Sequence, residues 1–282
     1  MPPELPLADV RAVSLAVNLP GPIAAARLRE LGAEVVKVEP PTGDPLASVT
    51  PRWYQKLSSG QAIIRLDLKD PEQRAAFENE LSRSDLLLTA MRPSAADRLG
   101  LSDIEQRHPA LSIIEIVGHD GELAEVPGHD LTYQAVYGTL TPPIMPTVPV
   151  ADLLGAERAV AAALLALMTR ERTGMGDRRR VVLEHAAAAA GAAVRYGLMG
   201  EGAPLGGADP AYGIYETADG YVAVAAIEPH FRARLSGALG ASTRHEFENA
   251  FRGRPTSEWA AMAKREDIPL SGIRQHLAGV VK

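Results

Sequence analysis

The sequence has no cysteine among its 282 residues, and only 5% of them are aromatic. The absence of cysteine excludes disulfides, thiolate nucleophiles and cysteine-ligated metals, so any chemistry must use carboxylate, histidine or hydroxyl groups. No run of about eighteen uncharged apolar residues occurs, which argues against a membrane-spanning helix. The first residues lack the basic and apolar regions of a signal peptide, and we therefore expect a cytoplasmic protein.

Basic residues are also in the minority. Lys and Arg number 29 against 35 Asp and Glu, which gives a net charge of -6. Nucleic acids are bound by clustered cations, so we expect no nucleic-acid partner. We expect the one basic run, residues 178–180, to flank a strand. No pair of histidines has the spacing of metal ligands among other donors, so no metal site is predicted.

The hydrophobic content, 46%, is enough for a large core or two smaller ones. In the first half, short apolar runs alternate with amphipathic segments. The runs predict strands at 10–18, 34–39, 62–68, 85–90 and 111–118, and the amphipathic segments predict helices at 23–32 and 71–84. This alternation predicts an α/β fold with a mostly parallel sheet covered on both faces. Ligands of such sheets bind at the carboxyl ends of the strands, so the important loops should start near Asn18, Met91 and Gly118.

The second half is more helical. Residues 152–174 predict a long helix with Asp152 at its start and Gly174 at its end, and residues 183–200 predict an alanine-rich helix. A linker rich in glycine and proline follows, and then two alternating strands joined by Ala-Asp-Gly predict a hairpin. Helical patterns run from there to Lys282. We therefore predict a large domain over residues 1–200 and a smaller α+β domain over residues 201–282.

Several segments resemble the family III CoA-transferases, the CaiB/BaiF-like group that includes the α-methylacyl-CoA racemases. In family order they are NLPGPIAAARLRELGAEVVKVEPPTGDP, IIRLDLKDPE, RPSAADRLGL, PGHDLTYQAVYG, VADLLGAERAVAAALLAL and YETADGYVAVAAIEPHF, and they span about residues 5–240. The resemblance implies a Rossmann-like large domain, a smaller second domain, and an interlocked homodimer with active sites between subunits. It also implies coenzyme A as the carrier of a thioester substrate, with no tightly bound cofactor.

Four residues match reactive positions of this family or adjoin one. Asp152 matches the carboxylate that is a nucleophile in the transferases and moves a proton in the racemases; a helix N-terminus should stabilise its ionised form, but aspartate there is commonly only an N-cap. His129, in the racemase-like GHD-x-x-Y segment, can donate or accept a proton near neutral pH; alternatively, it is a structural histidine. Its neighbour Asp130 either orients the imidazole or caps a helix that begins at Leu131. Glu228 matches a racemase glutamate that pairs with the histidine, or simply ends a strand before Pro229.

For CoA itself, the resemblance implies contacts from a set that comprises Asn18, Leu19, Pro20, Lys37, Arg92 and Arg98. Arginine suits phosphate groups, although exposed arginines are often just solvated. Two cations of the family pattern are missing, because Pro40 and Gln61 stand where relatives often have arginine and lysine, and we expect weaker CoA binding. Residues 153–156 replace a glycine-rich segment after Asp152, which should either narrow the space for the thioester or stiffen the start of the helix. The chain also ends near where relatives return a segment to the large domain, so we expect an altered dimer.

Three hypotheses follow. The leading one is an acyl-CoA racemase-like enzyme that inverts the α-carbon of a 2-methylacyl-CoA, with His129 and Asp152 as opposed acid and base and Glu228 in support. The second is a CoA transferase that moves CoA between carboxylic acids through a covalent Asp152 adduct. The third is a noncatalytic CoA-binding homologue, suggested by the missing cations and the shortened end. The nature of the acyl group cannot be read from the sequence.

Overall fold

The computed structural model describes residues 5–274, and the chain divides into two compact units, Met1–Gly191 and Ala192–Lys282. The first short helix of the second unit is α10 (Ala192–Arg195). Sequence composition puts the domain boundary a little later, after residue 200, and that boundary stays a prediction.

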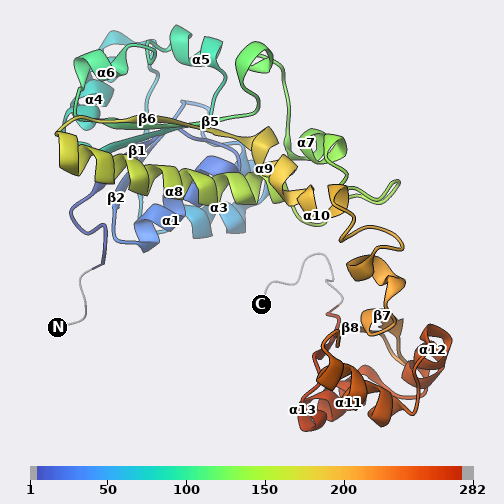
Figure 1. Cartoon of the computed structure of the whole chain (residues 1–282). Coiled ribbons are helices and arrows are strands. Elements are labelled where there is room, and N and C mark those ends of the chain that lie inside the picture. Colours follow the sequence, from blue (N-terminus) through green and yellow to red (C-terminus); the bar gives the residue numbers. More distant parts are fainter. Residues whose placement is uncertain (1–4, 275–282) are drawn as a thin grey trace. The chain divides into compact units, whose positions relative to one another are not determined.

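The first unit is built on a six-stranded parallel sheet with the order β3-β2-β1-β4-β5-β6 (Figure 1). This is the strand order of a Rossmann-like fold. The chain adds β2 and β3 on one side of β1 and then returns to add β4, β5 and β6 on its other side, so the strand order reverses between β1 and β4. The predicted α/β architecture is confirmed. The strands are β1 (Arg11–Ser14), β2 (Glu34–Glu39), β3 (Ala62–Arg65), β4 (Leu86–Thr89), β5 (Ser112–Val117) and β6 (Arg178–Val182).

The central strands β1, β4 and β5 are largely buried on both faces, which explains why they are mainly apolar runs. In β4, Leu86 and Leu88 enter one core cluster while Leu87 enters the other. Figure 1 shows helices on both sides of the sheet. One side carries α1 (Pro20–Glu30), α3 (Pro51–Ser58) and α8 (Val150–Thr173), and the other carries α4 (Pro71–Ser82), α5 (Pro93–Arg98) and α6 (Ile104–Arg107). The remaining helices of this unit are α2 (Leu46–Val49), η1 (Gly121–Leu123), α7 (Asp130–Val136) and α9 (Leu183–Ala190).

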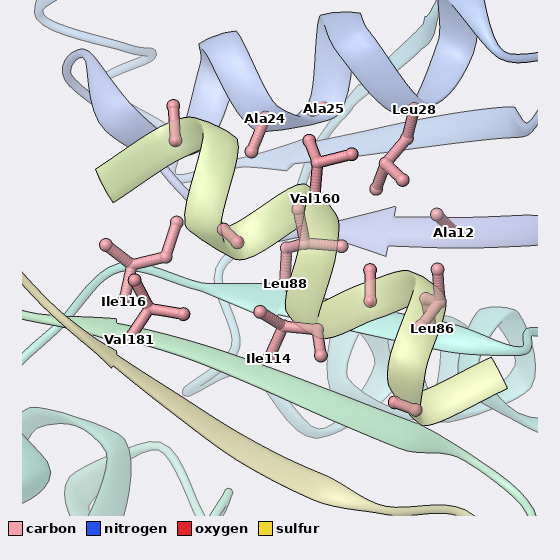
Figure 2. Close-up of a cluster of buried hydrophobic side chains, with 14 of the residues drawn as sticks. Ala12, Ala24, Ala25, Leu28, Leu86, Leu88, Ile114, Ile116, Val160 and Val181 are labelled. Atoms are coloured by element: carbon pink, nitrogen blue, oxygen red, sulfur yellow. The ribbon is translucent and has the colours of Figure 1, made fainter. Parts of the chain in front are cut away.

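Helix α8 lies close to the sheet because its buried face is mostly alanine. Ala156, Ala159, Ala163 and Ala166 have no exposed surface. Figure 2 shows Val160 of this helix among side chains of α1 and of the central strands. The helix ends at Gly174, which adopts a left-handed conformation with φ of 73°, as its sequence predicts.

Two helix predictions are wrong in extent. The alanine-rich segment 183–200 is interrupted at Gly191, where α9 ends and the short α10 follows, because glycine has a low helix propensity. The C-terminal region is not helical throughout, since β9 (Leu270–Gly272) pairs with β8. Residues 275–282 lie outside the described residues.

The basic run 178–180 lies within strand β6 rather than beside it. Arg178 and Arg180 both form ion pairs with Glu115 of the neighbouring strand, at N–O distances of 2.5 and 3.1 Å. These pairs give the run a structural explanation at the edge of the sheet.

The second unit is α+β, as predicted. Its antiparallel sheet has the order β7-β8-β9, with β7 (Tyr212–Glu216) and β8 (Tyr221–Ala225) forming the expected hairpin. An aromatic core holds it together, in which the Phe251 and Trp259 rings are 5.1 Å apart. The helical segments are η2 (Pro204–Ala208), α11 (Pro229–Leu239), α12 (Arg244–Arg252) and α13 (Thr256–Glu266). Between residues 5 and 274, no helix is long and apolar enough to cross a membrane.

Candidate functional site

A cavity of about 350 Å³ opens at the carboxyl ends of β1, β4 and β5, where the sheet order reverses. The loops expected to matter, those starting near Asn18, Met91 and Gly118, all contribute to its wall. This is the place where open α/β sheets bind their ligands. The lining residues are Val17, Asn18, Pro20, Ala90, Met91, Arg92, Ile116, Val117, Gly118, Val126, Pro127, Gly128, His129, Tyr133, Asp152 and Leu183.

The first loop is held by a buried ion cluster. Asn18 has a positive φ of 68°, and its backbone N–H donates to Asp44 Oδ1 at 3.2 Å. Asp44 Oδ2 in turn pairs with the Lys37 ammonium at 2.5 Å, and Glu39 lies 3.1 Å from the same nitrogen. Lys37 is only 2% exposed. This placement favours a structural role for Lys37 over the predicted contact with CoA.

Asp152 reaches the cavity from the third residue of α8, and its side chain is partly buried. The N-cap of this helix is Pro149, so the interpretation of Asp152 as an N-cap is excluded. The backbone N–H groups of Ala151 and Asp152 donate instead to Asp130 Oδ1, at 2.7 and 3.2 Å. Asp130 therefore occupies the free donors at the start of α8.

The ionised form of Asp152 is expected to be stabilised, but the surroundings of this residue favour the protonated form. Burial, followed by the nearby charge of Asp130, raises the pKa of Asp152 to about 7. The prediction that the helix N-terminus keeps this group ionised is wrong, because desolvation and a like charge both disfavour the carboxylate. Near neutral pH the group is divided between acid and base forms, which suits a residue that moves a proton.

His129 enters from the start of α7, where it is the N-cap residue. Its backbone N–H donates to Thr132 Oγ1 at 3.0 Å, and the Thr132 hydroxyl donates to the His129 carbonyl at 2.8 Å. These bonds fix the backbone beside the cavity. Helix α7 begins at Asp130 rather than Leu131, and the Asp130 carboxylate bonds to α8 rather than capping its own helix.

Apart from Lys37, the residues implied for CoA binding separate into two groups. Asn18, Pro20 and Arg92 line the cavity. Leu19 and Arg98 do not belong to its lining; Leu19 precedes α1, and Arg98 is an exposed residue at the end of α5.

The positive charges of Arg92 and Arg98 both lie near an acidic residue, Glu125. Glu125 bonds to the Ser94 hydroxyl and backbone N–H, each at 2.7 Å. These bonds, with smaller contributions from the charges of Arg92 and Arg98, lower the pKa of Glu125. An anion that approaches the two arginines therefore meets Glu125 as well.

Glu228 belongs to the second unit, where it is the exposed N-cap residue of α11. Its pairing with His129 stays a prediction.

Two departures from the family pattern acquire a physical meaning. Leu153 and Leu154 do not belong to the cavity lining, so they do not narrow it directly. Gln61 is half-buried and donates to the Leu57 carbonyl at 2.7 Å, which is a structural role.

A second cavity, of about 450 Å³, adjoins the first, and the two share Val17, Ala90 and Met91. Its walls are mainly apolar; Lys69 contributes a cation, and Glu39 and Asp67 contribute acidic groups. Pro40, which replaces the family arginine, is also part of this wall.

Sequence reasoning missed Tyr133 and Lys69 as cavity residues. Tyr133 is the last residue of the GHD-x-x-Y segment, so the motif contained its signal. Lys69 lies in the segment that follows β3, one of six strands in the sheet. No local sequence pattern distinguishes this lysine from others that follow strands. Among residues 5–274, no group of three or more His, Asp and Glu side chains is arranged to hold a metal ion.

Comparison with known proteins agrees with the fold. Over 194 residues, the sequence is 30% identical to succinyl-CoA--D-citramalate CoA-transferase of Chloroflexus aurantiacus, and this match covers 62% of the chain and 48% of that protein. It is 30% identical over 285 residues to the alpha-methylacyl-CoA racemase of Homo sapiens, covering 92% of the chain and 70% of the relative. The matched region thus spans about half the length of the Chloroflexus enzyme.

Among solved structures, the fold matches that of Rv3272 from Mycobacterium tuberculosis with a TM-score of 0.83. The sequence identity is 25%, and the match covers 97% of this chain and 84% of that one. The model of CoA-transferase family III matches residues 7–281. Because this match covers nearly the whole chain, the protein belongs to CoA-transferase family III, a family of enzymes that includes CoA-transferases and acyl-CoA racemases.

Proposed function

We propose that this protein is an acyl-CoA racemase-like enzyme that moves the α-proton of a 2-methylacyl-CoA thioester. The observation that carries the proposal is the common cavity of His129 and Asp152, in which the pKa of Asp152 is raised to about 7. Inversion needs one group to remove the α-proton and another, on the opposite face, to return a proton. A carboxyl group that exchanges its proton near neutral pH meets this need together with an imidazole, a group that can act as acid or base.

The reaction is written with these two groups alone. One of them takes the α-proton, and the electron pair of the C–H bond moves into an enolate whose negative charge lies on the thioester oxygen. The other group, in its protonated form, then delivers a proton to the opposite face of the α-carbon. In the reverse direction the two groups exchange roles.

The adjoining cavities support a long substrate. The catalytic side chains line the first cavity, and the mainly apolar second cavity shares three wall residues with it. An acyl-CoA has a reactive thioester at one end and a nucleotide at the other, and the pair of cavities offers space for both. We place the acyl end beside Asp152 and a more distant part of CoA toward Lys69.

The test is deuterium incorporation and inversion at the α-carbon of a 2-methylacyl-CoA in heavy water. We expect both with the wild type, and we expect Asp152→Ala and His129→Ala to lose inversion by at least about a hundredfold. A matched control is His245→Ala, since this side chain is 82% exposed on the second unit. Binding of the thioester without exchange would reject the racemase proposal and favour CoA transfer or a noncatalytic role.

A second candidate is CoA transfer through a covalent Asp152 adduct. The similarity to a citramalate CoA-transferase favours it, and Asp152 lies in the cavity as an acid or nucleophile would. In this reaction the carboxylate attacks the thioester, expels the CoA thiolate and forms a mixed anhydride. The thiolate then attacks the aspartyl carbonyl of the anhydride, which releases the original acyl group as its carboxylate and leaves an aspartyl thioester; an acceptor carboxylate reverses the two steps and leaves as the new acyl-CoA. Hydroxylamine would trap the adduct as a hydroxamate on Asp152; its absence during turnover would remove this candidate.

We also propose that the protein forms a homodimer. Helix α8 exposes Leu164, Leu165 and Met168 at 36%, 49% and 57%, an apolar surface typical of a subunit contact. Leu165 also lines a shallow cavity with Ala161 and Ala162 of the same helix. Cytoplasmic location, an interlocked arrangement of the dimer and the role of Glu228 stay predictions.

A further inference from the structure

Tyr133 lines the catalytic cavity together with His129 and Asp152, and neither proton-transfer role uses it. It belongs to α7, four residues after His129, and is only 2% exposed. A phenol in this position contributes a hydroxyl group to a cavity wall that also carries the polar side chains of Asn18 and Arg92.

Two glycines make room for the Tyr133 ring. A Cβ atom at Gly118 would lie 2.3 Å from the Tyr133 hydroxyl oxygen, and a Cβ at Gly128 would lie 2.4 Å from its Cε1. Both distances are far shorter than any normal contact between such atoms. Because both glycines also line the cavity, the phenol is wedged into the wall, with its oxygen beside the loop that follows β5.

A third contact restrains the ring from the side. The imidazole of His119 packs edge-on against Tyr133, with ring centroids 5.1 Å apart and planes at 81°. Glu184 of α9 holds His119 through a contact of 2.6 Å with Nδ1 and accepts a hydrogen bond of 3.1 Å from Tyr137. The bond to His119 lowers the pKa of Glu184, so the carboxylate stays charged and keeps this support in place.

The hydroxyl itself is uncommitted. Within residues 5–274 the Tyr133 hydroxyl forms no hydrogen bond. The hydroxyl of Tyr215, a tyrosine that is equally buried, donates to the Pro210 carbonyl. Burial, with a further contribution from the charge of Asp152, raises the pKa of Tyr133 to about 12. The phenol therefore keeps its proton at physiological pH and is available to donate it in a hydrogen bond.

We propose that the Tyr133 hydroxyl donates a hydrogen bond to the thioester carbonyl oxygen and is a third catalytic residue of this site. The inference rests on the proposed function and names the group that stabilises its intermediate. When the α-proton leaves, the C–H electron pair becomes the C=C bond of the enolate and the carbonyl π pair moves onto the oxygen. Tyr133 keeps its proton and strengthens its hydrogen bond as charge develops on that oxygen.

The first test is kinetic. Tyr133→Phe retains the ring between the two glycines and removes only the hydroxyl. We expect the kcat of α-proton exchange to fall about 100- to 1,000-fold, as for loss of one oxyanion donor, while KM changes less than about threefold. Tyr196→Phe is the control, because it removes a phenol that is 87% exposed and is not part of the cavity wall, and we expect it to keep wild-type kcat within about threefold. Equal rates for wild type and Tyr133→Phe would overturn the inference.

The second test does not depend on turnover. 2,2-Dimethylpropanoyl-CoA labelled with ¹³C at its carbonyl has no α-proton, so its bound infrared band reports hydrogen bonding alone. On the wild type we expect this band at or below its position in water, and on Tyr133→Phe clearly above it. A wild-type band above the position in water would overturn the inference without reference to the variant.

The two tests separate this inference from the proposed function. A lowered band without any exchange of a 2-methylacyl-CoA would support the Tyr133 contact and reject the racemase reaction. Exchange together with a band at the same position on the wild type and on Tyr133→Phe would reject the Tyr133 contact alone. Failure of the thioester to bind would reject both.

Discussion

Asp152 illustrates how burial and one charged neighbour change the chemistry of a residue. A helix N-terminus stabilises a nearby negative charge by about 0.3–1 kcal/mol, whereas one pKa unit corresponds to about 1.4 kcal/mol. The rise in the pKa of Asp152 from 3.8 to about 7 is therefore too large for the helix to offset. Asp130 also accepts the two N–H groups that would otherwise favour the charged form.

This pKa predicts a pH-dependent stability. Because the folded state binds the Asp152 proton more tightly than the unfolded state, the group makes the protein progressively less stable as pH rises from about 4 to about 7. Asp152→Asn removes the penalty. We expect this variant to be more stable than wild type by roughly 1–3 kcal/mol at pH 8, discounted for partial exposure, and little different at pH 4. Urea unfolding at both values measures it, and an equal difference at the two pH values would contradict the account.

Lys37 is predicted to be essential for stability. Its ammonium lies between Glu39 and Asp44, and all three side chains are at most 3% exposed. Lys37→Met leaves two buried carboxylates without their cation, which should cost about 3–5 kcal/mol. Denaturant unfolding measures this loss. If the variant keeps wild-type stability but loses affinity for CoA, the direct CoA contact implied by the family resemblance is favoured instead.

At the level of elements, α8 and α9 meet through a glycine. A Cβ at Gly155 would lie 2.2 Å from Leu183 Cδ2, and Leu183 also lines the catalytic cavity. Gly155→Ala should therefore displace Leu183 and cost about 1–3 kcal/mol through overpacking. We expect lower thermal stability together with a raised KM for the thioester. The paired variant Gly155→Ala/Leu183→Ala should recover part of the stability; failure to do so would argue against this contact.

The elements that local patterns predict well are those whose ends carry a chemical signal. The bounds of β2 match the run Glu34–Glu39, and Asp70 accepts hydrogen bonds from Glu72 and Gln73 at the start of α4. Strand β9 has only three residues and forms because β8 offers it a partner. Such a strand has no periodic pattern of its own to read.

The site was harder to predict because its key contacts join distant parts of the chain. Asp130 bonds to a helix that starts twenty residues later, and His119 meets Glu184 across 65 residues. The motif identified His129 and Asp152 as neighbours of a shared ligand. It did not indicate that burial, and then the charge of Asp130, raises the pKa of Asp152, since both effects depend on how the fold packs these residues together.

For the whole molecule, the apolar surface of α8 predicts the oligomeric state. Leu165→Glu places a charge on this surface, and Leu165 is not part of the wall of the catalytic cavity. We expect wild type at twice the chain mass of 30.0 kDa and the variant at the single-chain mass, by light scattering. Ala161 is less suitable for this test, because its smaller side chain contributes less apolar area to the surface than Leu165. A wild-type monomer, or a variant that remains a dimer, would show that subunits do not associate through this surface.

The most direct test of the account is α-proton exchange in heavy water, followed separately for the R and S thioesters with Asp152→Ala and His129→Ala. If the two side chains act on opposite faces of the α-carbon, each variant should lose inversion yet keep exchange for one enantiomer, and the retained enantiomers should be opposite. If both variants retain the same enantiomer, or if neither changes the exchange of either one, Asp152 and His129 are not the opposed acid and base of this site.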